Sequence, residues 1–223
     1  MSDFPTHPNS DRCQWGLYCI TDAYLTPRGH LEIAEAFIAG GARVIQFRDK
    51  AAAFEDLLRI GHELRRITRQ AGVVLIVNDN PYLCKEIDAD GVHLGQSDFP
   101  PYIARDVLGP DAIIGLSTHT RQQALEAMRM DVDYIGVGPV YATETKPDAE
   151  PPVGTALVRW VSQLVPLPIV AIGGISPATV PDVIAAGAHN IAVISGLITA
   201  DDIAHATKEM VSQVQLYRVE DSV

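Results

Sequence analysis

The chain has 223 residues, of which 47% are hydrophobic and 20% are charged, and this balance predicts one globular domain with a sizeable core. Its 28 acidic side chains outnumber its 17 basic ones, giving a formal net charge of -11. This charge excludes the basic surface typical of nucleic-acid-binding proteins and is repelled by anionic membranes, so we expect neither kind of partner. A site that gathers basic side chains and a divalent cation could still bind a small anionic substrate.

The first residues and the cysteines favour a cytoplasmic protein. Residues 1–13 mix acidic, basic and proline residues without an apolar stretch, which predicts a loose N-terminal tail rather than a secretory signal. Cys13, Cys19 and Cys84 form no CxxC pair and are odd in number, as is typical of reduced thiols. No run of 18 apolar residues predicts a membrane span.

Short apolar segments alternate with amphipathic segments along the chain. The apolar segments predict strands at residues 17–21, 43–48, 73–78, 91–96, 112–117, 134–140, 168–175 and 190–195. The amphipathic segments predict helices at residues 31–39, 54–70, 121–129, 155–164 and 177–186. Strands that are apolar throughout are typical of parallel sheets covered by helices on both faces, so the order predicts repeated crossover units.

Eight such units in a chain of this length favour a single (β/α)8 TIM barrel, which we expect over residues 14–217 with a C-terminal tail at 218–223. An open doubly wound sheet is the alternative, although no glycine-rich dinucleotide fingerprint follows the first strand. Residues 142–152 contain three prolines and predict a long loop after the sixth strand. Barrel chemistry lies at the carboxyl ends of the strands, so polar residues there are candidate site residues.

The second strand ends with three polar side chains on one face. Because side chains alternate along a strand, Gln46, Arg48 and Lys50 point one way while Ile45 and Phe47 point the other. Desolvated charges require compensation, so this face predicts an anionic ligand. The alternative is an internal salt bridge from Arg48 or Lys50 to a nearby carboxylate.

Two aspartates follow the third and fourth strands, where a barrel would aim both carboxylates into one mouth. Asp79 and Asp98 are hard oxygen ligands, and such a pair with positions left for phosphate oxygens favours Mg²⁺. Each could instead cap the following helix, because prolines come shortly after both. The histidines have no zinc-binding spacing, and we expect packing or surface roles for them, His93 included.

The seventh and eighth strands end in small residues that predict a phosphate site. Gly174, Ile194 and Ser195 would let a phosphate approach main-chain N–H groups, although glycine at a strand end also serves close packing or a turn. Further polar candidates at the same rim are Ser117, Thr143, Thr145 and Lys146.

Taken together, six segments resemble the thiamine phosphate synthase family over about residues 16–198. They are residues 45–50 (IQFRDK), 77–79 (VND), 91–98 (GVHLGQSD), 115–118 (GLST), 138–146 (GPVYATETK) and 171–175 (AIGGI). Members of that family join 4-amino-5-hydroxymethyl-2-methylpyrimidine diphosphate to a thiazole phosphate and release diphosphate, on a (β/α)8 barrel that requires Mg²⁺. The resemblance therefore implies a thiamine phosphate synthase.

The same resemblance assigns roles by position. It implies that Asp79 and Asp98 bind Mg²⁺ and that Arg48, Lys50, Lys146 and Ser117 act in catalysis. The residues implied around the pyrimidine diphosphate are Gln46, Arg48, Lys50, Asn78, Ser117 and Lys146, and Phe47 and Asp49 are also implied to bind substrate. Those implied around the thiazole phosphate are Thr143, Glu144, Thr145, Gly174, Ile194 and Ser195.

The resemblance also implies a dissociative reaction, in which diphosphate leaves before the thiazole nitrogen attacks and the 142–152 loop closes as a lid. Two other functions stay open: a thiazole phosphate isomerase of the related tautomerase type, and a non-catalytic protein that binds thiamine phosphate. Apolar outer helix faces permit a homodimer.

Overall fold

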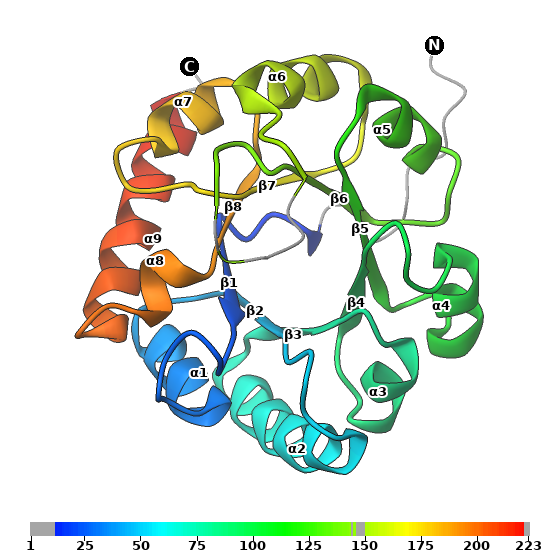
Figure 1. Ribbon diagram of the computed structural model, residues 1–223, viewed down its shortest axis with the longest axis vertical. Helices are drawn as coiled ribbons and strands as arrows, with labels where there is room; N and C mark the ends of the chain where they lie inside the picture. Colours follow the sequence, from blue (N-terminus) through cyan, green and yellow to red (C-terminus); the bar gives the residue numbers. More distant parts are fainter. Residues whose placement is uncertain (1–11, 144, 146–149, 221–223) are drawn as a thin grey trace.

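Eight parallel strands close into a barrel in chain order, and helices surround it (Figure 1). The structure, a computed structural model, describes residues 12–143, 145 and 150–220. The strands are β1 (Leu17–Thr21), β2 (Val44–Phe47), β3 (Val74–Asn78), β4 (Gly91–Leu94), β5 (Ile113–Thr118), β6 (Tyr134–Val137), β7 (Ile169–Ile172) and β8 (Asn190–Val193). The helices are α1 (His30–Ala39), α2 (Phe54–Ala71), α3 (Pro81–Glu86), α4 (Pro101–Leu108), α5 (Arg121–Ala127), α6 (Gly154–Leu164), α7 (Val180–Ala185), α8 (Ser195–Ile198) and α9 (Ile203–Glu220).

The closed order confirms the predicted (β/α)8 barrel and excludes the open sheet, because β1 pairs in parallel with both β2 and β8. All eight strands were predicted within a few residues. Four helices were not among those predicted: α3, α4, α8 and α9. The buried stripe of α9 is Ile203, Thr207, Met210 and Val214, so a polar residue interrupts its apolar pattern.

The strand interiors follow the predicted alternation. On β2, Gln46 points into the barrel and reaches Tyr18 of β1, whereas Phe47 lies on the outer side and packs edge-on against His30 of α1, with ring centroids 4.9 Å apart. Trp15 lies beneath this interior and packs edge-on against both Tyr18 and Tyr134. Side chains therefore fill the barrel toward the amino ends of its strands.

A buried side-chain amide joins β8 to the residues just before β1, next to the pairing of β1 with β8. Asn190 Oδ1 accepts the N–H groups of Trp15 (2.8 Å) and Gly16 (3.0 Å), and its Nδ2 donates to the Cys13 carbonyl (2.9 Å). Cys13 is fully buried, so the packed domain already includes this last residue of the predicted tail.

The predicted tails fall largely outside the described residues, which exclude 1–11 and 221–223. α9 extends to Glu220, past the predicted start of the C-terminal tail at 218. Within the described part of the chain, no helix combines the length and apolar character needed to cross a membrane.

Candidate active site

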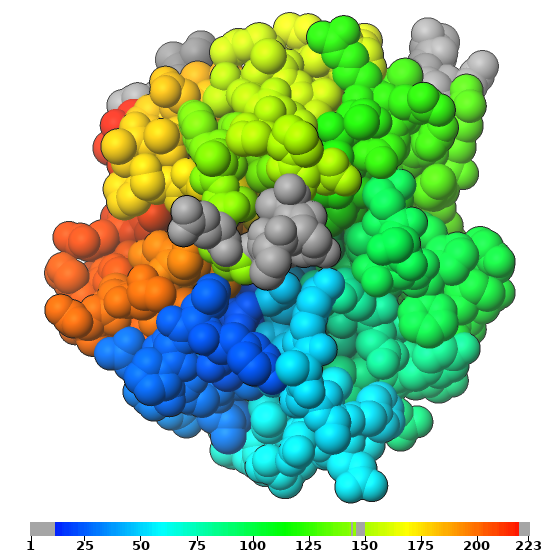
Figure 2. Space-filling model, in the orientation of Figure 1, coloured from blue at the N-terminus to red at the C-terminus, as the bar shows by residue number. Residues whose placement is uncertain are grey.

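The carboxyl ends of all eight strands open into one cavity of about 450 Å³. Figure 2 shows this face of the molecule, where the segments that follow the different strands meet around the barrel axis. The predicted site residues that line the cavity are Gln46, Arg48, Lys50, Asn78, Asp79, Asp98, Ser117, Thr143, Thr145, Gly174, Ile194 and Ser195. Glu144, Lys146 and residues 147–149 of the predicted lid lie outside the described residues.

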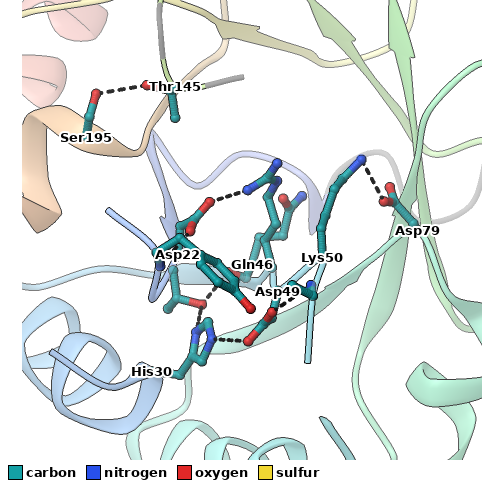
Figure 3. Close-up of polar contacts among 12 residues, drawn as sticks. Asp22, His30, Gln46, Asp49, Lys50, Asp79, Thr145 and Ser195 are labelled. Carbon is teal, nitrogen blue, oxygen red and sulfur yellow. Dashed lines mark hydrogen bonds and ion pairs between the residues drawn. The ribbon is translucent and has the colours of Figure 1, made fainter. Parts of the chain in front are cut away.

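Both basic residues at the end of β2 form ion pairs beside the cavity. The Arg48 guanidinium contacts the Asp22 carboxylate, and both side chains are buried. Lys50 Nζ lies 3.4 Å from Asp79 Oδ2 (Figure 3). The internal salt bridge considered from the sequence therefore exists, yet both cations also line the cavity. Asp22 was missed, although an aspartate directly after β1 was a signal of the same kind as Asp79.

Phe47 and Asp49 were predicted to bind substrate, but neither lines the cavity. Phe47 lies on the outer side of β2 because side chains alternate along the strand. The Asp49 carboxylate accepts the backbone N–H groups of Ala51 (3.1 Å) and Ala52 (3.0 Å), and its Oδ2 lies 3.1 Å from His30 Nε2. Asp49 therefore shapes the turn after β2 and points away from the ligand space.

The predicted carboxylate pair meets at the ends of β3 and β4. Asp79 has φ of 64°, in the left-handed region, and its N–H donates to the His93 carbonyl at 2.8 Å. Burial and the adjacent Asp98 carboxylate raise the pKa of Asp79 to about 6, because both disfavour its charged form more than Lys50 favours it. Asp98 is fixed by a bond from the Gly95 N–H to its Oδ2 at 2.7 Å.

Neither aspartate caps a helix, so the alternative role considered for them is wrong. The cap of α3 is Asn80, whose Oδ1 accepts the N–H groups of Tyr82 (3.0 Å) and Leu83 (3.1 Å). α4 begins after Pro100 without a side-chain cap. The two carboxylates are therefore free of a helix-starting function and face the cavity together.

The donor set of this carboxylate pair fits a magnesium ion. Among the described residues no group of three or more His, Cys, Asp or Glu side chains forms a metal site, so a cation here would be held by two carboxylates. Mg²⁺ is commonly bound in this way, with substrate phosphate oxygens completing its octahedron. Burial, and after it the neighbouring Asp98 carboxylate, raise the pKa of Asp79, and a cation between the two carboxylates would favour their charged forms.

The opposite rim is made of glycines and hydroxyl groups. Gly173 and Gly174 have φ of 100° and 61°, and a Cβ on Gly174 would lie 2.4 Å from the Ala142 carbonyl oxygen. Close packing therefore requires glycine here, which was the alternative role considered from the sequence. Because these two residues have no side chain, their backbone also forms part of the cavity wall. Thr145 Oγ1 and Ser195 Oγ lie 3.1 Å apart across this rim (Figure 3).

A chain of five polar side chains crosses the cavity floor, and the sequence predicted only its two ends. Gln46 Nε2 donates to the Tyr18 hydroxyl (3.0 Å), which lies 2.9 Å from the Tyr134 hydroxyl. His93 Nδ1 lies 3.0 Å from the Tyr134 hydroxyl and His93 Nε2 lies 2.9 Å from Ser117 Oγ. His93 thus belongs to the cavity wall rather than to ordinary packing. Two further lining residues missed from the sequence are His119 and Gln123.

Comparison with known proteins agrees with this geometry. Residues 17–197 match the family described as thiamine monophosphate synthase. The chain is 47% identical over 197 residues to the thiamine-phosphate synthase of Chloroflexus aurantiacus, covering 88% of this chain and 91% of that relative. It is 43% identical over 205 residues to that of Natronomonas pharaonis, covering 90% and 95%. The solved thiamine phosphate pyrophosphorylase from Pyrococcus furiosus superposes with a TM-score of 0.85 at 35% identity, covering 92% of this chain and 98% of that one. The chain therefore belongs to the thiamine monophosphate synthase family.

Proposed function

We propose that this transferase joins 4-amino-5-hydroxymethyl-2-methylpyrimidine diphosphate to a thiazole phosphate, giving thiamine phosphate and diphosphate. The main support for this proposal is a single cavity that has charged residues on one side and glycines and hydroxyl groups on the other. Arg48, Lys50 and a carboxylate pair lie on one side, and a glycine and hydroxyl rim lies on the other. The first wall suits a diphosphate with a divalent cation, and the second suits a phosphate monoester.

The diphosphate would bind beside β2 and β3. Arg48 is oriented by Asp22 through one terminal guanidinium nitrogen and lines the cavity, which leaves other N–H donors of the guanidinium for a phosphate oxygen. Lys50 and Asn78 line the same wall. Lys146, which lies outside the described residues, stays a prediction for this group.

Asp79 and Asp98 would hold the Mg²⁺ ion. When bound, the ion would supply positive charge to the diphosphate oxygens as that group leaves. Around it, Lys50 keeps a cation within 3.4 Å of Asp79, and the Gly95 N–H orients Asp98. The chain's own residues thus position the carboxylates before any substrate arrives.

The reaction breaks one C–O bond and forms one C–N bond. The bonding electron pair departs with diphosphate, whose charge Arg48 and Lys50 stabilise, and the aminopyrimidine delocalises the positive charge left on its exocyclic carbon. The thiazole nitrogen then attacks with its lone pair, so no general base is needed. Electron-withdrawing substituents on the pyrimidine should slow this dissociative path strongly, and a weak dependence of the rate on them would count against it.

The second substrate would bind at the opposite rim. Thr145 and Ser195 offer two hydroxyl groups, and Gly174 and Ile194 offer main chain at the cavity wall for its phosphate. Thr143 lies beside them, and its Oγ1 accepts the Thr145 N–H at 3.3 Å. This placement would bring the thiazole nitrogen to the pyrimidine across the width of the barrel mouth.

Incubation of the purified protein with both substrates and Mg²⁺, followed by chelation of the metal, tests the proposal. Thiamine phosphate and diphosphate should form in equal amounts, stop on chelation and resume when Mg²⁺ is restored. Isomerisation of the thiazole alone would establish the tautomerase-type alternative. Binding of thiamine phosphate without turnover would establish a non-catalytic protein. We also predict a cytoplasmic enzyme and a homodimer, the latter to be checked by light scattering.

A further inference from the structure

The polar chain on the cavity floor joins side chains from five strands. Gln46 (β2), Tyr18 (β1), Tyr134 (β6), His93 (β4) and Ser117 (β5) are linked by four contacts of 2.9 to 3.0 Å. Tyr18 and Tyr134 are at most 1% exposed and Gln46 is 3% exposed. A buried hydroxyl must donate its hydrogen to some acceptor, so the direction of each bond in such a chain constrains the next.

Two glycines leave room for the side chains of this hydrogen-bonded series. A Cβ on Gly115 of β5 would lie 2.1 Å from Tyr134 Cζ and 2.5 Å from its hydroxyl oxygen. A Cβ on Gly136 of β6 would lie 3.2 Å from His93 Cε1. The Tyr134 and His93 rings also stack, with centroids 5.5 Å apart and an interplanar angle of 27°. The geometry of the chain is therefore built into the strands around it.

The hydrogen bond from Gln46 determines which group donates in each of the following hydrogen bonds. Because its Nε2 donates to the Tyr18 oxygen, the buried Tyr18 hydroxyl directs its own hydrogen to Tyr134. Tyr134 accepts from Tyr18, so its hydrogen goes to His93 Nδ1. A neutral imidazole that accepts at Nδ1 carries its proton on Nε2, which donates to Ser117 Oγ. The hydroxyl hydrogen of Ser117 is then directed toward the cavity that it lines.

We infer that His93 is a positioning residue, locked by Tyr134 as the tautomer with its proton on Nε2, so that Ser117 presents a hydrogen-bond donor to the substrate. At the other end of the chain, Gln46 keeps its Oε1 as an acceptor. The cavity thereby offers one acceptor and one donor, a pattern that suits a heterocycle carrying an amino group and a ring nitrogen. The identity of this substrate rests on the proposed function.

The opposite direction is the competing arrangement. If the Gln46 amide were turned over, its Oε1 would accept from Tyr18 and every bond in the chain would reverse. His93 would then donate from Nδ1 to Tyr134 and accept at Nε2 from Ser117, leaving the cavity without the Ser117 donor. The position of one proton on His93 distinguishes the two arrangements.

The test is ¹⁵N NMR of the histidine side chains in the full-length protein at about neutral pH, with the His93 signals identified by their absence in His93→Gln. The inference predicts a proton on Nε2 and none on Nδ1, and in Tyr134→Phe it predicts a mixture of tautomers. A proton on Nδ1 in the unmodified protein, whether or not Nε2 also carries one, would overturn it. This measurement needs no substrate, so its outcome is independent of the proposed function.

Two substitutions of His93 form a matched pair for kinetics. Gln places an amide N–H near the position of Nε2 and keeps a donor for Ser117, whereas Asn reaches only the position of Nδ1. His93→Asn should raise KM for the pyrimidine substrate about three- to tenfold, the effect of one lost hydrogen bond, with KM for the thiazole unchanged. His93→Gln should stay close to the unmodified enzyme. Equal losses in both variants, or equal rises in both KM values, would contradict a positioning role.

Discussion

Asp79 combines a left-handed backbone with a carboxylate held against a second carboxylate. Its φ of 64° is uncommon for a residue with a side chain, and burial beside Asp98 raises its pKa to about 6. Each feature costs on the order of 1 kcal/mol or more in the free protein. Strain of this kind persists where a ligand benefits from it, which is consistent with the proposed cation site.

The Asp79→Asn substitution should stabilise the metal-free protein at pH 7. The pKa of Asp79 is raised from 3.8 to about 6 on folding, so the folded state loses stability as pH rises through this interval. Asn removes the charge and tolerates the same backbone, so the variant should gain about 1 to 2 kcal/mol above pH 6 and almost nothing below pH 4. Urea unfolding in chelator at both pH values measures this. An equal difference at the two pH values would contradict the account.

The same experiment with added Mg²⁺ tests the metal site without turnover. Mg²⁺ should raise the melting temperature of the unmodified protein and leave that of Asp79→Asn nearly unchanged, because ligands stabilise only the state that binds them. The same shift in both proteins would place the cation elsewhere.

Two substitutions of Asp98 distinguish the role of its negative charge from the role of its hydrogen bond to the Gly95 N–H. Asp98→Ala and Asp98→Asn should both abolish most turnover, since each removes a proposed ligand of the cation. Both variants remove the charge that disfavours ionised Asp79, but only the Asn side chain can still accept the Gly95 N–H that now bonds to Asp98 Oδ2. The Ala variant should therefore have an unfolding free energy about 1 kcal/mol lower than the Asn variant. Steady-state rates and urea unfolding of both variants give the comparison. Full activity in either one would remove Asp98 from the metal site.

At the scale of elements, glycines on β5 and β6 make room for large side chains from other strands of the barrel. Gly115→Ala should lose about 1 to 3 kcal/mol of unfolding free energy, because its Cβ would overlap the Tyr134 ring. Gly29→Ala is the control, since nothing lies within 4 Å of its Cβ and its φ of −76° suits alanine. Similar stabilities of the two variants by urea unfolding would show that β5 has room to adjust.

The strands were predictable from sequence because a strand buried on both faces needs apolar residues at nearly every position, as in β1, which is buried throughout. Four helices were not predicted: α3 and α8 are only six and four residues long, α4 begins with Pro101 directly after Pro100, and Thr207 lies in the buried stripe of α9. Strand alternation also placed Gln46, Arg48 and Lys50 on the cavity side. The same alternation placed Phe47 on the opposite face, and its inclusion among the substrate-binding residues came from the family resemblance alone.

At the scale of the whole molecule, contacts between distant parts of the chain were not accessible to sequence reasoning. Tyr18 and Tyr134 meet although 116 positions separate them, and no local pattern marks either as a partner of Gln46. Arg48 likewise finds Asp22 from a neighbouring strand end. The sequence could identify which strand ends carry polar groups, but pairing them required the closed barrel.

Asn190 strengthens the closure of the barrel, because its side chain joins β8 to the segment before β1. Asn190→Ala should cost about 2 to 4 kcal/mol of unfolding free energy, because it leaves buried N–H groups of Trp15 and Gly16 without their acceptor. Urea unfolding measures the loss, and an unchanged denaturant slope would confirm that the barrel still unfolds as one unit. A loss well below about 1 kcal/mol would show that β1 and β8 close the barrel without this amide.

The most direct test of the proposed chemistry is a crystal structure with thiamine phosphate, diphosphate and Mg²⁺ bound. We predict the metal between the Asp79 and Asp98 carboxylates and a diphosphate oxygen, Arg48 and Lys50 on the diphosphate, and the thiazole phosphate at the rim of Thr145, Gly174 and Ser195. A complex in which the two carboxylates turn away from the metal, or in which diphosphate binds at the glycine rim, would contradict the account.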